Sequence, residues 1–108
     1  MIIDEILTAA GFVKNRTYKE TRFLSAPKQE FCVWSDQVSA WGSDLGCRIK
    51  RHSVTIELYT YDQASTAESR IETELSSRFP EWEKFEKDWL TDGQFFMTTY
   101  MFDYLDKS

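Results

Sequence analysis

Few side chains in this sequence are of the types that carry out chemistry, and they follow no catalytic or metal-binding pattern. His52 is the single histidine, so a zinc site with several histidines is excluded by counting. As a lone general base, His52 would need a nucleophile beside it, and no motif supplies one. We therefore expect His52 to lie on the surface or at a strand edge.

The two cysteines, Cys32 and Cys47, are separated by 14 residues, and the sequence contains no CxxC motif. The opening residues Met1 to Glu5 are acidic where a signal peptide would be basic. We interpret both cysteines as buried thiols in a reducing cytoplasm rather than as a disulfide, redox pair or metal site.

Carboxylates gather in two places, residues 68–74 and residues 81–88. Paired carboxylates can act as acid and base, but Glu68 with Glu72, and Arg70 with Glu74, are i, i+4 neighbours on a predicted helix. A solvated helix face explains them. The four glycines fall at turns or caps and form no phosphate-binding loop. We predict no catalytic residue, no cofactor and no metal, and hence no enzyme.

The length and the net charge of the chain exclude further classes of protein. The chain has 108 residues, which suits one domain, 1–108. Its net charge of -5 opposes binding to nucleic acid, and no run is long enough for a membrane-spanning helix. Aromatic residues make up 16% of the chain and concentrate in its last third, so the core is rich in rings or some rings serve a partner.

The elements that would position these side chains begin with residues 52–62, where Val54, Ile56 and Leu58 alternate with more polar neighbours. This period predicts a half-buried central strand. Before it, residues 2–10 have a helical apolar stripe that Gly11 is expected to end. Residues 12–28 are interpreted as a loop with a short edge strand at most.

A first strand is predicted at residues 31–34, continuing less clearly to residue 38. The turn residues 42–46 then lead back into the central strand, so we expect an asymmetric hairpin with the longer arm second. Ser65 and Glu68 form a capping-box pattern that opens a helix ending near Phe79.

Residues 84–89 alternate as a strand, although Trp82, Phe85 and Trp89 also fit a helix over 81–90. We prefer the strand because the Thr91-Asp92-Gly93 turn needs a partner arm before residues 94–104. The result is an α+β domain of two layers: a mostly antiparallel four-stranded sheet with helices packed on it, in the order α-β-β-α-β-β.

The order of three local strings resembles a known family. Ile56 to Thr60, Glu68 to Leu75 and Tyr100 to Phe102 resemble strands and a helix of the small tail-completion or tail-terminator-like proteins of long-tailed phages and prophages of Gram-positive bacteria. Pro27 to Trp34 resembles that family's proline-led first strand, and Asp44 stands near an acidic turn common in it. The resemblance spans about residues 27–104.

The resemblance implies a structural role in virion assembly. Copies would form a homo-oligomeric ring that caps the tail-tube protein and offers a surface to a head–tail connector protein, without nucleic acid or membrane. It places the protein in the host cytoplasm during assembly and in the virion neck or tail afterwards.

Subunit contacts are predicted from the rings and the turn. A plain core accounts for most rings of the C-terminal hairpin, but a strand that is apolar on both faces needs two covers, and a second subunit can be one of them. The candidate contact residues are Trp41, Asp44, Trp89, Phe96, Tyr100 and Phe102. The alternative is a small monomeric binding module of the inhibitor or immunity type.

Overall fold

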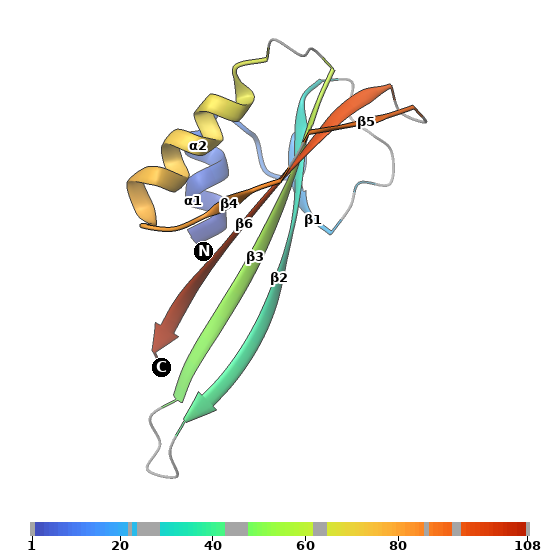
Figure 1. Ribbon diagram of the computed structural model, residues 1–108. Helices are drawn as coiled ribbons and strands as arrows, with labels where there is room; N and C mark the ends of the chain where they lie inside the picture. The colour runs from blue at the N-terminus through green and yellow to red at the C-terminus, as the bar shows by residue number, and fades with distance from the viewer. Residues whose placement is uncertain are drawn as a thin grey trace.

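The computed structural model describes residues 2–21, 23, 29–42, 48–61, 65–85, 87–91 and 94–107. Two helices pack on one face of a six-stranded mixed sheet (Figure 1). The elements in chain order are α1 (Ile2–Ala9), β1 (Tyr18–Glu20), β2 (Phe31–Gly42), β3 (Arg48–Thr60), α2 (Ala67–Arg78), β4 (Glu83–Lys84), β5 (Asp88–Leu90) and β6 (Phe95–Lys107).

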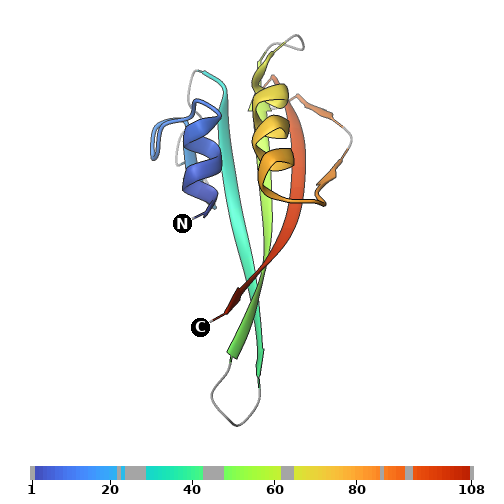
Figure 2. The same ribbon diagram turned by 90° about the vertical axis from the view of Figure 1, so that its left-hand side faces the viewer.

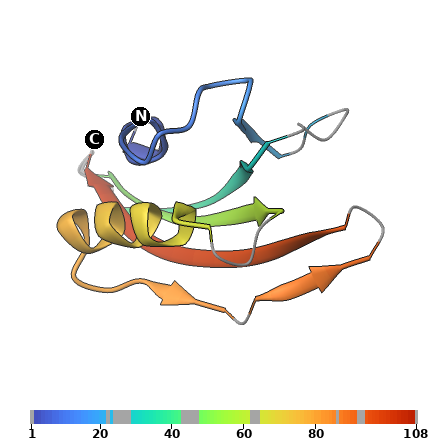
Figure 3. The same ribbon diagram turned by 90° about the horizontal axis from the view of Figure 1, so that it is seen from above.

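The sheet is ordered β1-β2-β3-β6-β4, and β5 also pairs with β6. β3 is antiparallel to both β2 and β6, and β4 and β5 are antiparallel to β6, whereas β1 runs parallel to β2. Figure 3 shows the sheet from above, with β4 and β5 forming the border beyond β6. Cross-strand rows such as Trp34–Ile56–Tyr100 fix the register, and with it the face to which each side chain points.

Even-numbered residues of the long strands, at 32–34, 54–58 and 100–102, face the helices and form the core. Val54, Ile56 and Leu58 are fully buried there, and they pack with the apolar stripes of α1 and α2, which lie side by side over the sheet (Figure 2). Burial of each such side chain contributes roughly 1.5–3 kcal/mol. The central strand predicted around these three residues is confirmed as β3.

Glycine ends the first helix as the sequence predicts. Gly11 has a φ of +98°, a conformation that costs glycine little. Its amide donates to the Thr8 carbonyl at 3.0 Å, and the Phe12 amide donates to the Leu7 carbonyl at 3.0 Å. This pair of bonds is a Schellman motif, which satisfies carbonyls at the helix end.

The start of α2 differs from the predicted capping box. The Ser65 Oγ accepts a hydrogen bond from the Ala67 amide at 3.1 Å, and the Ser65 hydroxyl donates to Glu30. Glu68 turns instead toward two lysines, so it does not complete a box with Ser65. Ser65 thus bonds a backbone amide at the helix start, while ion pairs with distant lysines take Glu68 out of the box.

Beyond the helices, the three long strands continue as a narrow extension, which we call the arm: residues 37–42 of β2, 48–53 of β3 and 103–107 of β6 (Figure 1). The arm accounts for the elongated outline of 52 × 29 × 23 Å. Where side chains of the arm are described, none is buried. The remainder of the molecule is called the body.

The prediction gave the sheet too few strands, four rather than six, and gave its hairpin two arms of unequal length. Residues 18–20 form β1, a parallel edge strand, and residues 83–90 form two short strands rather than one. The choice of strand over helix for that segment is confirmed. The hairpin arms are nearly equal, at 12 and 13 residues, because β2 stays paired with β3 as far as Gly42, well beyond the apolar run at residues 31–34.

Candidate assembly surfaces

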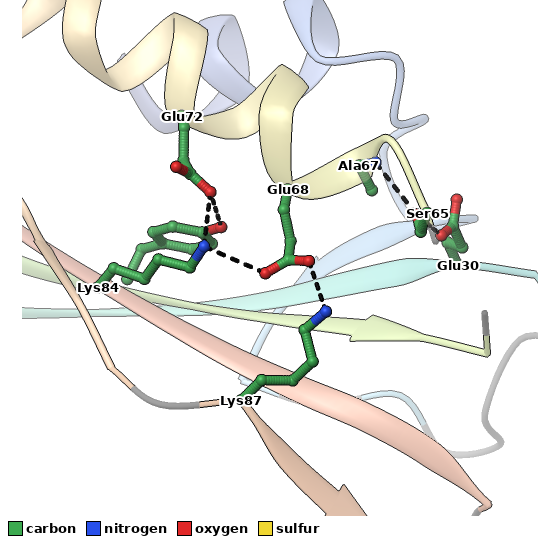
Figure 4. Close-up of polar contacts among 8 residues, drawn as sticks. Glu30, Ser65, Ala67, Glu68, Glu72, Lys84 and Lys87 are labelled. Atoms are coloured by element: carbon green, nitrogen blue, oxygen red, sulfur yellow. Dashed lines mark hydrogen bonds and ion pairs between the residues drawn. The ribbon is translucent and has the colours of Figure 1, made fainter. Parts of the chain in front are cut away.

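The acidic face of α2 is bound to the border of the sheet rather than solvated. We call the contacts of Glu68 and Glu72 with Lys84, Lys87 and Tyr100 the clamp. Glu68 contacts Lys84 at 3.2 Å and Lys87 at 2.6 Å (Figure 4). Glu72 contacts the same Lys84 at 2.9 Å and accepts a hydrogen bond from the Tyr100 hydroxyl at 2.9 Å. These contacts fasten the helix to the segment that contains β4 and to β6.

The electrostatics of this clamp favour fixed charges over proton transfer. Burial alone would raise the pKa of Glu68, but hydrogen bonds from Lys87 and Lys84 outweigh it and hold that pKa below its usual range. The hydrogen bond with Glu72 raises the pKa of Lys84, and burial raises the pKa of Tyr100 far above its usual range. The pKa shifts of Glu68, Lys84 and Tyr100 therefore all favour the protonation state that each group ordinarily has at neutral pH.

His52 lies in the central strand rather than on the surface or at a strand edge. Its side chain is 13% exposed, its Nδ1 lies 2.6 Å from Asp36 Oδ2, and its ring stacks on Tyr104 with 4.5 Å between centroids. The lone histidine was misplaced because its strand begins four residues earlier than the apolar pattern. It bridges strands at the base of the arm.

Cys32 is a buried free thiol, as predicted. Burial raises its pKa well above the ordinary value, so the sulfur stays protonated and unreactive. Cys47 lies outside the described residues. Within the described part of the chain, His, Cys, Asp and Glu side chains form no group of three or more that could hold a metal ion.

Within the same described ranges, no helix combines the length and the apolar character needed to cross a membrane.

The border of the sheet carries an exposed ring pair. Trp89 on β5 is 49% exposed, and its ring lies 4.8 Å from that of the half-buried Phe96 on β6. Lys87 places its ammonium group 5.6 Å from the Phe96 ring. Both rings belong to the predicted contact set, and both are positioned at a surface.

The sheet face away from the helices carries a second aromatic group that the sequence analysis missed. Phe31 stacks on Tyr59 at 4.6 Å, and Phe95 meets both rings edge-on. Tyr61, 39% exposed, also contacts Phe95 edge-on. Burial, with the neighbouring Glu57 carboxylate, raises the pKa of Tyr59 to about 12. The apolar alternation on both sides of residues 94–104 was the available signal for this face.

The arm has two strand edges that are unpaired within the described residues. β1 pairs with β2 only at residues 32–34, and β4 and β5 pair with β6 only up to Met101. Beyond these points β2 and β6 have β3 as their described neighbour on one side alone. Val38 is 50% exposed and Leu105 is 58% exposed on these edges. Unpaired edges with apolar side chains are templates for adding another strand.

The other predicted contact residues divide into two groups. Tyr100 and Phe102 are 0% and 3% exposed, so they belong to the core of the subunit and have little surface to offer a second copy. Trp41 pairs with Ile49 near the end of the arm, and Asp44 lies outside the described residues. The structure thus brings Trp89 and Phe96 together and leaves Trp41 far along the arm.

The comparisons with known proteins give a shared fold without a related sequence. Neither a family model nor a curated protein sequence matches the chain. Among solved structures, a chain from the virion of a native gene transfer agent particle has a similar fold, with a TM-score of 0.56. Their sequences are 9% identical, and the match covers 95% of this chain and 84% of the other. The α+β architecture of this chain therefore also occurs in a chain of that virion.

Proposed function

We propose that this protein is a structural component of a phage-like virion, with its copies assembled around the end of a tail tube. The observation that carries the proposal is the fold shared with a chain of a gene transfer agent virion over 95% of this chain. The resemblance of residues 27–104 to tail-completion proteins supports the same class of function. The role needs no catalytic residue, cofactor or metal.

The finer role that we propose is that of a tail terminator. Copies would form a ring that stops growth of the tail tube and joins it to a head–tail connector protein. The elongated subunit, with a helix-covered body and a projecting arm, supports this role because a ring subunit must contact its neighbours and the tube at once.

A second candidate is a small binding module of the inhibitor or immunity type. The exposed Trp89 and the net charge of -5 favour it, since both suit a monomer that captures a basic partner. Neighbouring genes discriminate the two: a tail-tube gene beside this one supports the virion role, and a toxin gene supports the alternative.

The decisive experiment adds the purified protein to tail-tube protein from the same genome during polymerisation. We expect shorter tubes of uniform length with extra density at one end by electron microscopy. Tubes of unchanged length, with the protein absent from the tube pellet, would refute the proposed role.

Matched variants assign the contact surface in the same assay. Trp89→Ser is expected to weaken tube capping, whereas Phe85→Ser removes a similarly exposed ring, at 45% against 49%, from outside the predicted contact set. Equal losses from both would show that general surface hydrophobicity, rather than the Trp89–Phe96 pair, drives binding.

A further inference from the structure

We propose that copies of this chain join through their arms, with the free edge of β2 in one copy pairing with the free edge of β6 in the next. The result is a sheet that continues from subunit to subunit in one direction. This inference rests on the proposed ring for its choice of a second copy as the partner, and it names the contact that closes the ring.

The hydrogen bonds at the body show which backbone groups point outward from each edge. The Cys32 amide donates to Thr17, and the Trp34 carbonyl accepts from Thr21, both at 2.8 Å. Backbone groups alternate along a strand, so the even-numbered residues Val38 and Ala40 direct theirs outward along the arm.

The edge of β6 follows the opposite parity. The Phe85 amide donates to the Thr99 carbonyl at 2.9 Å, so odd-numbered residues of β6 point outward. Asp103, Leu105 and Lys107 therefore present their amide and carbonyl groups on the far side of the arm from β2. Each arm therefore has a row of backbone donors and acceptors along each of its two edges. The row on β6 of one copy can form hydrogen bonds with the row on β2 of the next copy.

Strand direction is compatible with this pairing. β2 and β6 are both antiparallel to β3, so they run parallel to each other. Two copies in the same orientation would thus bring β2 and β6 together as parallel neighbours. The same edge of β2 already accepts a parallel strand, β1, at residues 32–34.

The outline of the sheet favours a closed ring over an open ribbon. In the body, β1 borders β2, while β4 and β5 border β6, whereas the arm has three strands (Figure 1). Arms that pair directly would therefore converge, and the wider bodies would diverge around them. A tapered subunit joined head to tail curves toward closure, with the arms innermost.

The edge of β6 is accessible where this pairing would begin. An open groove of about 730 Å³ lies beside the first residue of β4, lined by Glu83, Met101 and Asp103 and, across the sheet, by Gln37 and Ser53. The edge of β2 beyond Asp36 carries no charged residue up to Gly42, so it brings no like charge to Asp103 on the edge of β6.

Two proline variants test the pairing from its two sides. Val38→Pro removes an outward amide from β2, and Leu105→Pro removes one from β6, while bonds to β3 remain. Val38→Ala and Leu105→Ala are the controls, since they shorten the same side chains but keep the amides. Circular dichroism and thermal melting establish that each variant is folded.

We expect the wild-type protein to self-associate in sedimentation velocity as its concentration is raised, and each proline variant to do so at least about tenfold more weakly. Mixing the two proline variants should restore one interface, because each retains the edge that the other lacks. Native mass spectrometry should then show a heterodimer that grows no further.

Three results would overturn the inference. The wild-type protein could remain monomeric up to about 1 mM, the mixture could fail to form heterodimers, or Leu105→Pro alone could associate as strongly as wild type, which would indicate symmetric β2–β2 pairing. If proline unfolds the chain, Val38→Lys and Leu105→Lys replace the two variants, because lysine on an edge opposes strand addition without altering the backbone.

The tube-capping assay separates this inference from the proposed function. If wild type and both proline variants cap tubes equally well, arm pairing is wrong and the virion role stands. If the arms pair but tube length is unaffected, the virion role is wrong and self-pairing stands.

Discussion

The same three strands behave differently in the body and in the arm. In the body, Val54, Ile56 and Leu58 of β3 are fully buried beneath two helices. In the arm, Val38 and Leu105 are 50% and 58% exposed although β2, β3 and β6 keep the same register. Backbone pairing is thus continuous while side-chain burial stops.

This difference separates the source of stability from the surface available to partners. Burial in the body supplies the free energy that holds the sheet together. The arm adds backbone hydrogen bonds and an exposed ion pair, Arg51 to Asp103 at 2.6 Å, and exposed ion pairs contribute little. We therefore expect substitutions in the body to change folding, and substitutions in the arm to change association.

The largest expected effect comes from placing a charge in the body. Ile56→Asp buries an unpaired carboxylate at a site with 0% exposure and should cost more than about 4 kcal/mol, enough to unfold the domain. Val38→Asp leaves the same charge in water and should scarcely alter thermal melting. Equal melting temperatures for Ile56→Asp and wild type would show that the core has been misplaced.

A milder test removes the same atoms from both regions. Leu75→Ala, at 0% exposure on α2, should lower the free energy of unfolding by roughly 2–5 kcal/mol through lost burial and a cavity. Leu105→Ala should lie within about 0.5 kcal/mol of wild type. Urea denaturation of both variants measures the difference, and similar losses would mean that the arm contributes to the folded core.

The smallest effect is a dependence on pH. The folded pKa of Glu68 lies below its unfolded value, so the folded chain binds fewer protons there. The resulting stability is present above the unfolded pKa, about 4.3, and is lost as the pH falls through the folded pKa.

Glu68→Gln should therefore flatten the acid limb of the stability curve by about 1 kcal/mol or less. Asp103, whose pKa is lowered mainly by its hydrogen bond from Arg51, gives the same sign in the arm. Because that pair is more exposed, salt should weaken the effect of Asp103→Asn more than that of Glu68→Gln. Identical salt dependence would show that the clamp is as solvated as the arm.

Sequence patterns predicted those helices and strands that are determined by residues close together in the chain. Period-two alternation around Ile56 identified the central strand, and Gly11 marked the end of α1. The turn before Gln94 justified a strand where helical spacing competed. In each case the deciding residues lie within one element or one turn of chain.

What could not be predicted depends on contacts between distant segments. A short edge strand was allowed within residues 12–28, but its position at β1 could not be predicted, because β1 is three residues long and gains its pairing from β2. Lys84 and Lys87 draw Glu68 away from its predicted role at the helix start. Tyr100 and Phe96 lie on the same face of an apolar strand, and only the position of α2 leaves one buried and the other near the border.

Strand order along the chain also bears on how this protein is made. β3 is paired on one side by β2, which precedes it, and on the other by β6, which follows α2, β4 and β5. During translation the central strand therefore has its β6-facing edge unpaired until residues 95–107 have been synthesised. A chain with an unpaired strand edge is prone to aggregate, and α2, which precedes β6 in the sequence, covers the apolar face of that strand in the folded protein.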